Sequence, residues 1–401
     1  MFKKLLILII TAFVDMVGLL MILPLMPFYA RTLGASSLMV TLLISSFTAA
    51  QLLSAPMWGR FSDRYGRRPA LLVGLGAAAI AYVVFAFATS LWLLLLSRLV
   101  QGAGGGTVGV IQAYVADATD TKNRAKALGW LSAATNVGVA LGPPLGSLAL
   151  LAGRSGPGLA AAALCVINMA FAWKFLRESA ELAGKHLARK PSASRTAIAY
   201  VITHARAPGP RLIWIYAIAM GAFSGMNAIL ALFLMDRFGI TERRIWIFFT
   251  YIGTISVITR AGVLGRAVDR FGEAQLSRIG LILLSTGLLA FPFVHNYALL
   301  AIVIACIPLG TAFTFPCVTS LLSRVIPSNE RGLYMGVQQA YGGMARVIVP
   351  LWAGFSYDHF GKNVPFITSA VLVLGSLFLN IGVDDGRKVK TPPDIVGEAA
   401  V

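Results

Sequence analysis

Long apolar runs separated by short polar gaps are the main pattern along the chain. Each run has about 20 residues, the length that an α-helix needs to cross a lipid bilayer. The runs are continuous and lack the alternation of barrel strands, so we expect twelve helices. The predicted spans of the first half are residues 5–28, 38–58, 70–88, 91–114, 127–151 and 158–173. Those of the second half are residues 212–235, 245–264, 276–294, 297–322, 333–355 and 364–381.

The chain carries an internal repeat with a step of 206 residues. The repeated residues are Gly59, Arg60, Asp63, Arg64 and Gly66, and their counterparts are Gly265, Arg266, Asp269, Arg270 and Gly272. The repeat predicts an all-α membrane protein with twelve transmembrane helices in two pseudo-symmetric bundles, an architecture typical of secondary transporters. We expect the bundles at residues 1–176 and 211–382, a basic cytoplasmic linker at 177–210 and a cytoplasmic tail at 383–401.

Composition places the chain in lipid. Hydrophobic residues make up 57% of the sequence and charged residues 12%, and the mean hydropathy is +0.78. This leaves too little polar surface for a soluble globule of 401 residues. In a soluble protein the net charge of +18 would favour nucleic acid as a partner. Here the positive residues stand in short gaps between apolar runs, so we expect contact with membrane lipid and no nucleic-acid partner.

Lysine and arginine are distributed unequally between alternate gaps. One set of gaps, together with the termini, holds 25 of the 34 positive residues, and the opposite gaps hold six. The positive-inside rule therefore places both termini in the cytoplasm. The first 27 residues resemble a signal peptide, but their apolar run is too long for one and contains Asp15, so we predict a retained helix. We expect a multi-pass protein of the inner cell membrane that functions as a monomer.

Cysteine and histidine give no indication of a metal or catalytic site. Cys165, Cys306 and Cys317 fall in predicted spans and lack metal-ligand spacing. The four histidines are scattered along the chain. We therefore predict buried apolar thiols, no metal, no cofactor and no enzymatic activity.

Asp15 is the one acidic residue in the middle of a predicted span, whereas the other fifteen acids fall in loops, at span ends or in the tail. It lies about 15 Å deep at the helical rise. An ionised carboxylate at such a depth costs about 2.5 to 3.5 kcal/mol, and desolvation favours the neutral form. We predict that Asp15 carries protons reversibly or binds a cationic substrate. The alternative is a structural aspartate bonded to a neighbouring helix.

Three arginines also lie within predicted spans. Arg98 begins a segment of small residues that runs to Gly106 and permits close helix contact. Its guanidinium can pair with a carboxylate or favour the ionised form of one nearby, and Asp15 is the candidate partner. Arg346, in the eleventh span, binds an anionic part of a substrate or is held by backbone carbonyls or another helix. Arg260, near the inner end of its span, is expected to extend to the interface.

Four segments resemble the major facilitator superfamily, and within it the twelve-span drug/proton antiporters, which include tetracycline and multidrug exporters. The superfamily signature is matched by Gly59, Asp63, Arg64, Gly66, Arg67 and Arg68. The segment from Arg98 to Gly106 is similar to the fourth-helix motif. The fifth-helix motif of the antiporters is matched by Gly138, Gly142, Pro143 and Gly146, and their first helix by Asp15, Gly18, Pro24 and Pro27. The likeness covers residues 5–382.

The resemblance implies a cytoplasmic latch between the two halves. Asp63 would face the start of the eleventh helix, whose positive dipole end suits an anion. Arg64 or Arg67 would pair with Asp117 at the end of the fourth helix, and the latch would favour the outward-open state. Simple positive-inside anchoring would explain the arginines, but not the glycines and the aspartate at this spacing.

The second copy of the signature departs from the first. It keeps Gly265, Asp269 and Arg270, but Glu273 and Ala274 stand where the first copy has two arginines. We therefore expect a weaker latch in the second half.

The fifth-helix segment has two compatible interpretations. Pro143 removes a backbone hydrogen bond and kinks the helix, while the glycines let a neighbouring helix approach. In the family this kinked helix seals one route between the halves and accompanies export, which the resemblance implies here. Tetracycline exporters also carry acids in their third and ninth helices, whereas residues 70–88 and 276–294 contain none, so tetracycline is not the favoured substrate.

These features predict an exporter of small amphipathic molecules or drugs, antibiotics among them, in exchange for protons by alternating access. The substrate cavity is expected to include Gln51, Phe223, Asn227, Gln338, Tyr341 and Arg346. Protonation of Asp15 from outside would release the substrate, and deprotonation toward the cytoplasm would permit reloading. The alternative in the same fold is a proton-coupled importer or a uniporter of a small metabolite, with Arg346 binding an anionic group. A channel would usually need a ring of like groups.

Overall fold

The computed structural model describes residues 2–119, 121–176 and 191–383, and in these ranges the chain forms helices and no strand. The predicted all-α fold class is therefore confirmed. The chain divides into two compact units. Unit 1 comprises residues 1–185, 227–257 and 350–360, and unit 2 comprises residues 186–226, 258–349 and 361–401.

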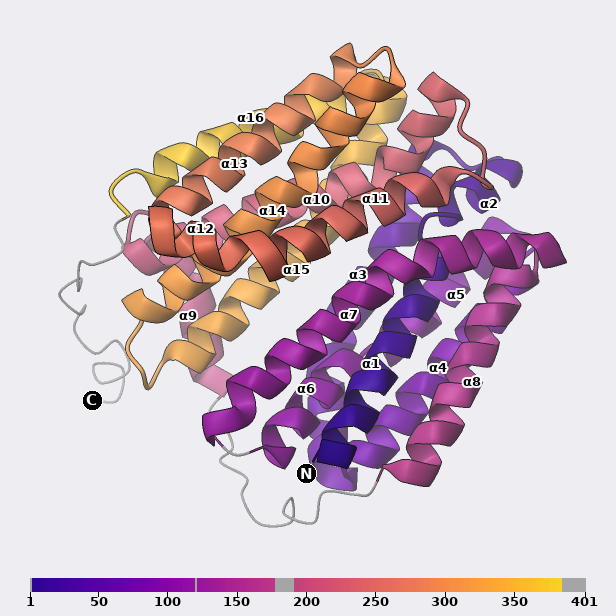
Figure 1. The fold of residues 1–401 in the computed structure, drawn as a ribbon, viewed down its shortest axis with the longest axis horizontal. Coiled ribbons are helices and arrows are strands. Elements are labelled where there is room, and N and C mark those ends of the chain that lie inside the picture. Colours follow the sequence, from indigo (N-terminus) through magenta and orange to yellow (C-terminus); the bar gives the residue numbers. More distant parts are fainter. Residues whose placement is uncertain (1, 120, 177–190, 384–401) are drawn as a thin grey trace. The chain divides into compact units, whose positions relative to one another are not determined.

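Unit 1 contains the helices of the first half of the chain. They are α1 (Phe2–Ile22), α2 (Met26–Thr32), α3 (Ser37–Tyr65), α4 (Arg67–Ala86), α5 (Leu91–Gly104), α6 (Thr107–Ala118), α7 (Thr121–Ala149), the short 3-10 helix η1 (Leu150–Ala152) and α8 (Gly156–Phe175). The unit also includes the later part of α10 (Pro208–Phe238), most of α11 (Ile245–Ile258) and the last part of α15 (Arg331–His359). Within it α1 packs along α7, and α4 along α8 (Figure 1).

Unit 2 contains most of the second half. Besides the remaining parts of α10 and α15, its elements are α9 (Pro191–Thr203), the π-helix η2 (Thr259–Val263), α12 (Leu264–Phe271), α13 (Glu273–Ala290), the 3-10 helix η3 (Phe291–Phe293), α14 (Tyr297–Val325) and α16 (Val364–Asn380). Here α13 packs against both α14 and α16 (Figure 1).

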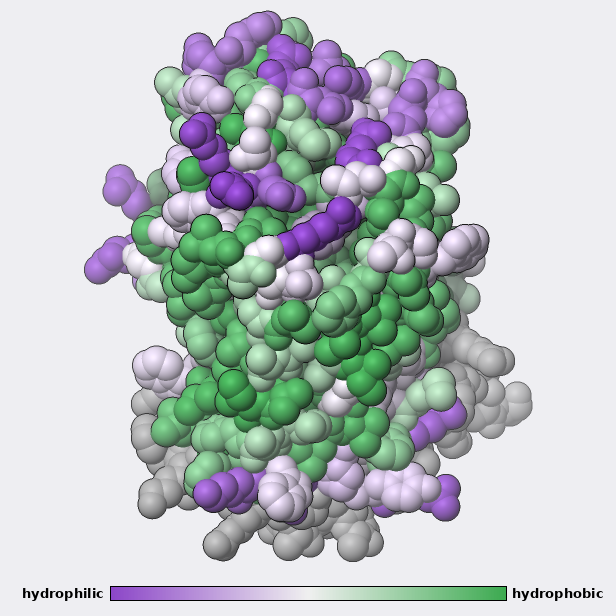
Figure 2. Space-filling model, turned by 90° about the vertical axis from the view of Figure 1, so that its right-hand side faces the viewer, coloured by the Kyte–Doolittle hydropathy of each residue, from purple (hydrophilic) through white to green (hydrophobic). Residues whose placement is uncertain are grey.

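In the described part of the chain, ten helical segments are long and apolar enough to cross a membrane. With α15, which covers the predicted eleventh span, and the shorter apolar helix α16, they account for the twelve predicted spans. Figure 2 shows hydrophobic residues across the middle of one face of the molecule, with hydrophilic residues gathered toward the ends. The chain is thus a multi-pass membrane protein.

The repeated glycines of the signature explain two sharp turns between helices. Gly66 joins α3 to α4 with a φ of 103°, and Gly272 joins α12 to α13 with a φ of 76°. A side chain at either position would clash with the backbone in this left-handed region, which glycine enters freely. The sequence repeat is therefore also a repeat of backbone geometry.

Three local features differ from the predicted spans. The fourth span is divided at Gly105 and Gly106, where two flexible residues interrupt α5 and α6. The eighth span contains the π-helix η2, and the predicted linker contains the helix α9. The rest of that linker, residues 177–190, and the tail, residues 384–401, lie outside the described residues.

Candidate functional site

Asp15 lies where α1 meets the start of α6. Its Oδ2 accepts a hydrogen bond from Oγ1 of Thr107 at 3.0 Å. Thr107 is the first residue of α6 and is 4% exposed, and Asp15 is half-buried. The positive end of the α6 dipole favours the ionised carboxylate, whereas the apolar surroundings of α1 favour the neutral acid. The two effects oppose each other, which suits a group that gains and loses a proton.

Close helix contacts hold Thr107 in this place. A Cβ atom added at Gly74 of α4 would lie 2.5 Å from Cγ2 of Thr107, so α4 packs directly against it. On the other side of the break, a Cβ at Gly104 would lie 2.6 Å from the Cβ of Ala77. The carbonyl of Gly105 accepts a hydrogen bond from Nε2 of Gln51 at 2.9 Å. The small residues after Arg98 therefore fix the α5–α6 break against α3 and α4.

Arg98 is fully buried in α5, and none of its three guanidinium nitrogens has a hydrogen-bond partner in the described part of the chain. Its Cζ atom lies 5.8 Å from the centroid of the Phe85 ring. Tyr82 interacts electrostatically with both Arg98 and Asp15, and its hydroxyl accepts a hydrogen bond from Nε2 of Gln101 at 2.6 Å. Among the described residues Arg98 makes no hydrogen bond to Asp15, although both groups lie within electrostatic range of Tyr82.

The glycines of the fifth-helix motif are buried against the helix that carries Asp15. A Cβ added at Gly138 would lie 2.9 Å from the carbonyl oxygen of Phe13, and one at Gly142 would lie 2.6 Å from the Cβ of Leu20. At Gly146 it would overlap the backbone of Met21. The motif thus brings the α7 backbone against α1 on both sides of Asp15 along the helix. No larger residue fits there without moving α1.

The first copy of the signature forms an ion pair within itself. Nη1 of Arg67 lies 2.7 Å from Oδ1 of Asp63 and donates a hydrogen bond to Oγ of Ser62 at 3.0 Å. Gly59 and Arg64 are exposed. The side chain of Asp117 lies outside the described residues, so its pairing with an arginine stays a prediction. The contact of Asp63 with the start of α15 would join the two units and also stays a prediction.

Arg68, the last residue of the signature, has a structural role. It donates a hydrogen bond to the carbonyl of Trp173, near the end of α8. The last carbonyls of a helix lack partners within the helix, and a cation is favoured there. Arg68 therefore ties the start of α4 to the end of α8.

The second copy contains an ion pair between a buried glutamate and an exposed arginine, which the sequence analysis did not predict. Gly265, Asp269 and Arg270 are exposed on α12, but Glu273 is only 8% exposed. Its Oε1 accepts hydrogen bonds from Nη2 of Arg324 at 2.7 Å and from Oγ of Ser320 at 2.8 Å.

Glu273 and Arg324 occupy the repeat positions of Arg67 and Asp117. The steps are 206 and 207 residues, so the second half has the same two charged positions with the signs exchanged. The step from Asp117 to Arg324 is the sequence signal that could have revealed this ion pair. The pair of Glu273 and Arg324 joins α13 to α14 within unit 2.

The predicted cavity residues belong to both units, and the structure describes each group separately. In unit 1, Gln51 donates to the carbonyl of Gly105 at the α5–α6 break, and Oδ1 of Asn227 is buried without a hydrogen-bond partner among the described residues. In unit 2, Oε1 of the buried Gln338 accepts a hydrogen bond from Thr319 at 3.3 Å. The hydroxyl of Tyr341 donates to the carbonyl of Ile198 in α9 at 3.0 Å, so Tyr341 fastens α9 to α15.

The other two predicted cavity residues are Phe223 and Arg346. Phe223 is half-buried, with its ring centroid 6.4 Å from that of Phe315. Arg346 is half-buried, and its Nε is buried without a hydrogen-bond partner in the part that the structure describes. Arg260, which we expected at the interface, is half-buried with an unpartnered Nε in the described ranges and interacts with Tyr216.

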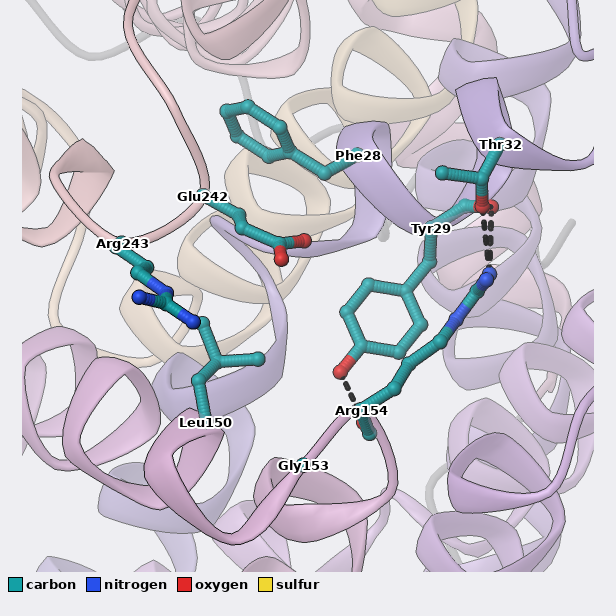
Figure 3. A pocket seen from close by; sticks show the side chains of 8 residues that line it. All are labelled: Phe28, Tyr29, Thr32, Leu150, Gly153, Arg154, Glu242 and Arg243. Atoms are coloured by element: carbon teal, nitrogen blue, oxygen red, sulfur yellow. Dashed lines mark hydrogen bonds between the residues drawn. The ribbon is translucent and has the colours of Figure 1, made fainter.

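A pocket of about 210 Å³ lies in unit 1, and none of the predicted cavity residues is among those that line it (Figure 3). It is lined by Phe28, Tyr29, Thr32, Leu150, Gly153, Arg154, Glu242 and Arg243. The hydroxyl of Tyr29 donates to the carbonyl of Arg154, whose Nη2 donates to Oγ1 of Thr32 at 2.6 Å. The charge pattern assigns these loops to the outside, so the pocket marks the predicted outer end of the unit.

The same end of unit 1 contains a close contact between α3 and α15. A Cβ added at Gly354 of α15 would overlap Oγ1 of Thr41 in α3. The hydroxyl of Tyr357 donates to Oδ2 of Asp236 in α10 at 2.8 Å. Asp358 accepts hydrogen bonds from the backbone at the start of α3. Residues more than 300 positions apart are thus fastened together at this end.

The spans, the repeat and the charged groups within the spans are typical of a membrane transporter. The family model of the Major Facilitator Superfamily matches residues 8–264 and 261–398, and the chain belongs to this superfamily.

Relatives and solved structures are similar over nearly the whole chain. The chain is 26% identical to multidrug resistance protein 2 of Bacillus subtilis (strain 168) over 376 residues, which cover 92% of each protein. It is 29% identical to the class C tetracycline resistance protein of Escherichia coli over 351 residues, covering 85% of the chain and 86% of that protein. The crystal structure of the human organic anion transporter MFSD10 (TETRAN) has the same fold, with a TM-score of 0.71, 24% identity and coverage of 94% and 99%.

Proposed function

We propose that this protein exports small amphipathic molecules or drugs from the cytoplasm in exchange for protons, by alternating access. The observation that carries the proposal is the place of Asp15, which is bonded to Thr107 at the start of α6 and held by the glycines of α7. An acid in a membrane span is expensive and marks a proton or ion pathway. Relatives named as multidrug and tetracycline resistance proteins support the export of drugs.

Asp15 takes a proton from the outside and releases it to the cytoplasm in this proposal. The neutral acid fits the apolar surroundings of α1, and the ionised carboxylate is stabilised by Thr107 and the α6 dipole. Arg98 has no hydrogen-bond partner among the described residues, and both Arg98 and Asp15 lie within electrostatic range of Tyr82. Protonation removes the negative charge of Asp15 and frees the substrate, and deprotonation restores the loading state.

Two contacts would alternate as gates. The contact of Asp358 with α3 closes the outer end, and the signature around Asp63 closes the inner end. The protein would lie in the inner cell membrane with both termini in the cytoplasm, and a monomer would suffice, because each copy holds both repeats. Its partners would be the substrate, protons and membrane lipid.

A second candidate function is proton-coupled or uniport transfer of a small anionic metabolite. The half-buried Arg346, whose Nε has no hydrogen-bond partner among the described residues, favours it. Import would use the same fold and the same gates.

A growth-inhibition panel tests the proposal. Cells that make the wild-type protein are expected to tolerate higher concentrations of several amphipathic drugs than cells that make Asp15→Asn. Membrane levels of both proteins are matched by immunoblotting. Equal tolerance in both strains for every compound would contradict the proposed export.

A further inference from the structure

Arg260 and Arg346 are arginines of unit 2 that lie within its predicted membrane spans. Arg260 lies in the π-helix η2, and Arg346 lies in α15. Both side chains are half-buried, and the Nε atom of each is buried without a hydrogen-bond partner in the part that the structure describes. A buried donor that lacks an acceptor is destabilising, and more so when it is charged. A π-helix inside an α-helix is frequent at functional sites.

No carboxylate within the described spans of unit 2 can neutralise these two charges. Its described acids are Asp269 on α12, Glu273 at the start of α13 and Glu330 just before α15, and Glu273 is occupied by Arg324. All three lie at the ends of helices rather than within the bilayer depth. The positive charge of the two spans is therefore not balanced by their own unit.

Tyr216 of α10 lies near both arginine-bearing elements. The π-helix η2 packs against α14, and the ring of Phe315 in α14 has its centroid 5.3 Å from that of Tyr216. Tyr216 also lies within electrostatic range of Arg260. Its hydroxyl oxygen accepts a hydrogen bond from Nε2 of Gln339 at 3.3 Å, and a Cβ added at Gly342 would lie 2.7 Å from the Tyr216 ring. Gln339, Gly342 and Arg346 are three and four residues apart in turn, so they share one face of α15. Because Gln339 supplies the donor in that bond, Tyr216 keeps its own O–H for another acceptor.

An aromatic surface adjoins this group of donors. The ring centroid of Phe315 in α14 lies 5.3 Å from that of Tyr216 and 6.4 Å from that of Phe223. Aromatic side chains bind the apolar body of a ligand, while a few placed polar groups fix its orientation. Unit 2 thus combines guanidinium and hydroxyl donors with an apolar surface.

We propose that Arg260, Arg346 and Tyr216 form an anion-binding subsite and that the substrate is an amphipathic organic anion. A carboxylate or sulfonate of the substrate accepts hydrogen bonds from the two guanidiniums and from the Tyr216 hydroxyl. Its aromatic or alicyclic body packs on Phe315 and Phe223. The inference rests on the proposed transport function and narrows its substrate class, because an unbalanced positive site disfavours lipophilic cations.

Binding of three matched probes tests the inference. Naphthoate, naphthamide and naphthylmethylammonium share a ring system and carry a negative, a neutral and a positive group. Their dissociation constants are measured by calorimetry on the full chain in phosphatidylcholine nanodiscs. We expect naphthoate to bind about tenfold more tightly than naphthamide, as charge-assisted hydrogen bonds require. Tighter binding of the cation or of the amide would overturn the inference.

Variants assign the effect to the proposed residues. Arg260→Gln and Arg346→Gln should each weaken naphthoate binding about tenfold and leave naphthamide binding unchanged. Arg346→Lys should retain part of the affinity, which shows that the site is folded and that charge is needed. Arg266→Gln, which removes an exposed arginine from the neighbouring α12, is the matched control. Naphthoate binding that is unchanged in both Gln variants would overturn the inference.

Two further experiments are needed. One distinguishes a substrate anion from a lipid headgroup, and the other distinguishes the anion-binding subsite from proton coupling. Phosphatidylglycerol in the nanodisc should leave naphthoate binding intact, and complete competition by this lipid would instead make a lipid headgroup the occupant. Proton movement driven by neutral or cationic drugs, with anions inert, would overturn the anion subsite and leave proton-coupled export in place. Arginine-dependent naphthoate binding without proton movement for any compound would leave the subsite and overturn the coupling.

Discussion

Asp358, near the end of α15, accepts a hydrogen bond from the backbone N–H of Leu38, near the start of α3, at 2.8 Å. Its other carboxylate oxygen accepts from the N–H of Ser37 at 3.1 Å. The first N–H groups of a helix have no partner within the helix, and the dipole there favours an anion. Asp63 stands near the end of α3, and family resemblance directs it at the start of α15. In the proposed cycle Asp358 of α15 would thus cap the start of α3 in one state. Asp63 of α3 would cap the start of α15 in the other state.

Removal of the Asp358 carboxylate should loosen the outer contact. In Asp358→Ala we expect backbone hydrogen exchange of residues 36–42 to rise by about threefold to tenfold, since the N–H of Leu38 loses a charged acceptor at an exposed position. Hydrogen exchange followed by mass spectrometry measures this. Glu242→Ala, which removes another acid from the same end, should leave this segment unchanged. Unaltered hydrogen exchange of residues 36–42 in Asp358→Ala would show that this contact does not hold the outer end closed.

The outer contact should also depend on pH. Although burial alone would raise it, hydrogen bonds from Leu38 and Ser37 and the charge of Arg31 hold the pKa of Asp358 below its ordinary value. A carboxylate whose pKa is lowered by folding stabilises the folded state at every pH above its pKa in the unfolded state. This contribution is lost as the pH falls through its pKa in the folded state. The difference in unfolding temperature between wild type and Asp358→Ala should stay constant from pH 8 down to about 5 and shrink below about 4. A difference that grows on acidification would contradict this.

Three features of the sequence predicted parts of the structure: the length of the apolar runs, the internal repeat and the charged residues within the spans. Span length predicts the helices, because bilayer thickness fixes how many apolar residues a span needs. The repeat predicted two similar halves, and its glycines Gly66 and Gly272 both have positive φ. The cost of a charge in lipid selected Asp15, which the structure places against another helix start.

Other features could not be read from one-dimensional patterns. The break at Gly105 and the π-helix around Arg260 lie inside predicted spans, and the length of a span does not show where its helix is interrupted. The contact of Asp358 with α3 joins residues 320 positions apart, and an acid at a span end has no distinguishing signal in the sequence. A partner of Arg98 was expected among the acids, whereas the structure places the ring of Phe85 beside it, because spacing along a helix gives no distance between helices.

Packing of α7 against α1 should not tolerate a larger residue. In Gly142→Val the new side chain would meet the Cβ of Leu20 and the carbonyl of Val17, so we expect a loss of about 1 to 3 kcal/mol in unfolding free energy and a loss of transport. The exposed Gly129 of the same helix has nothing within 4 Å of an added Cβ. Gly129→Ala should therefore be neutral or slightly stabilising. Thermal unfolding in detergent checks both, and equal stability of the two variants would refute the close contact.

The exchanged charges of the second half predict a rescue. Glu273→Arg should destabilise unit 2, because it places a second cation beside Arg324 and removes the acceptor of Ser320. The double variant Glu273→Arg with Arg324→Asp restores the charge order of the first half and should regain at least half of the lost unfolding temperature. Arg270→Asp, on the exposed face of α12, controls for surface charge. A double variant no more stable than the single one would exclude an equivalent pair.

Proton movement driven by substrate tests directly whether Asp15 exchanges a proton in each transport cycle. Purified protein in proteoliposomes with a pH-sensitive dye inside is mixed with a compound from the growth panel. We expect a pH change inside the proteoliposomes for wild type and for Glu242→Gln, and none for Asp15→Asn. Proton movement that continues at the wild-type rate in Asp15→Asn would contradict this expectation.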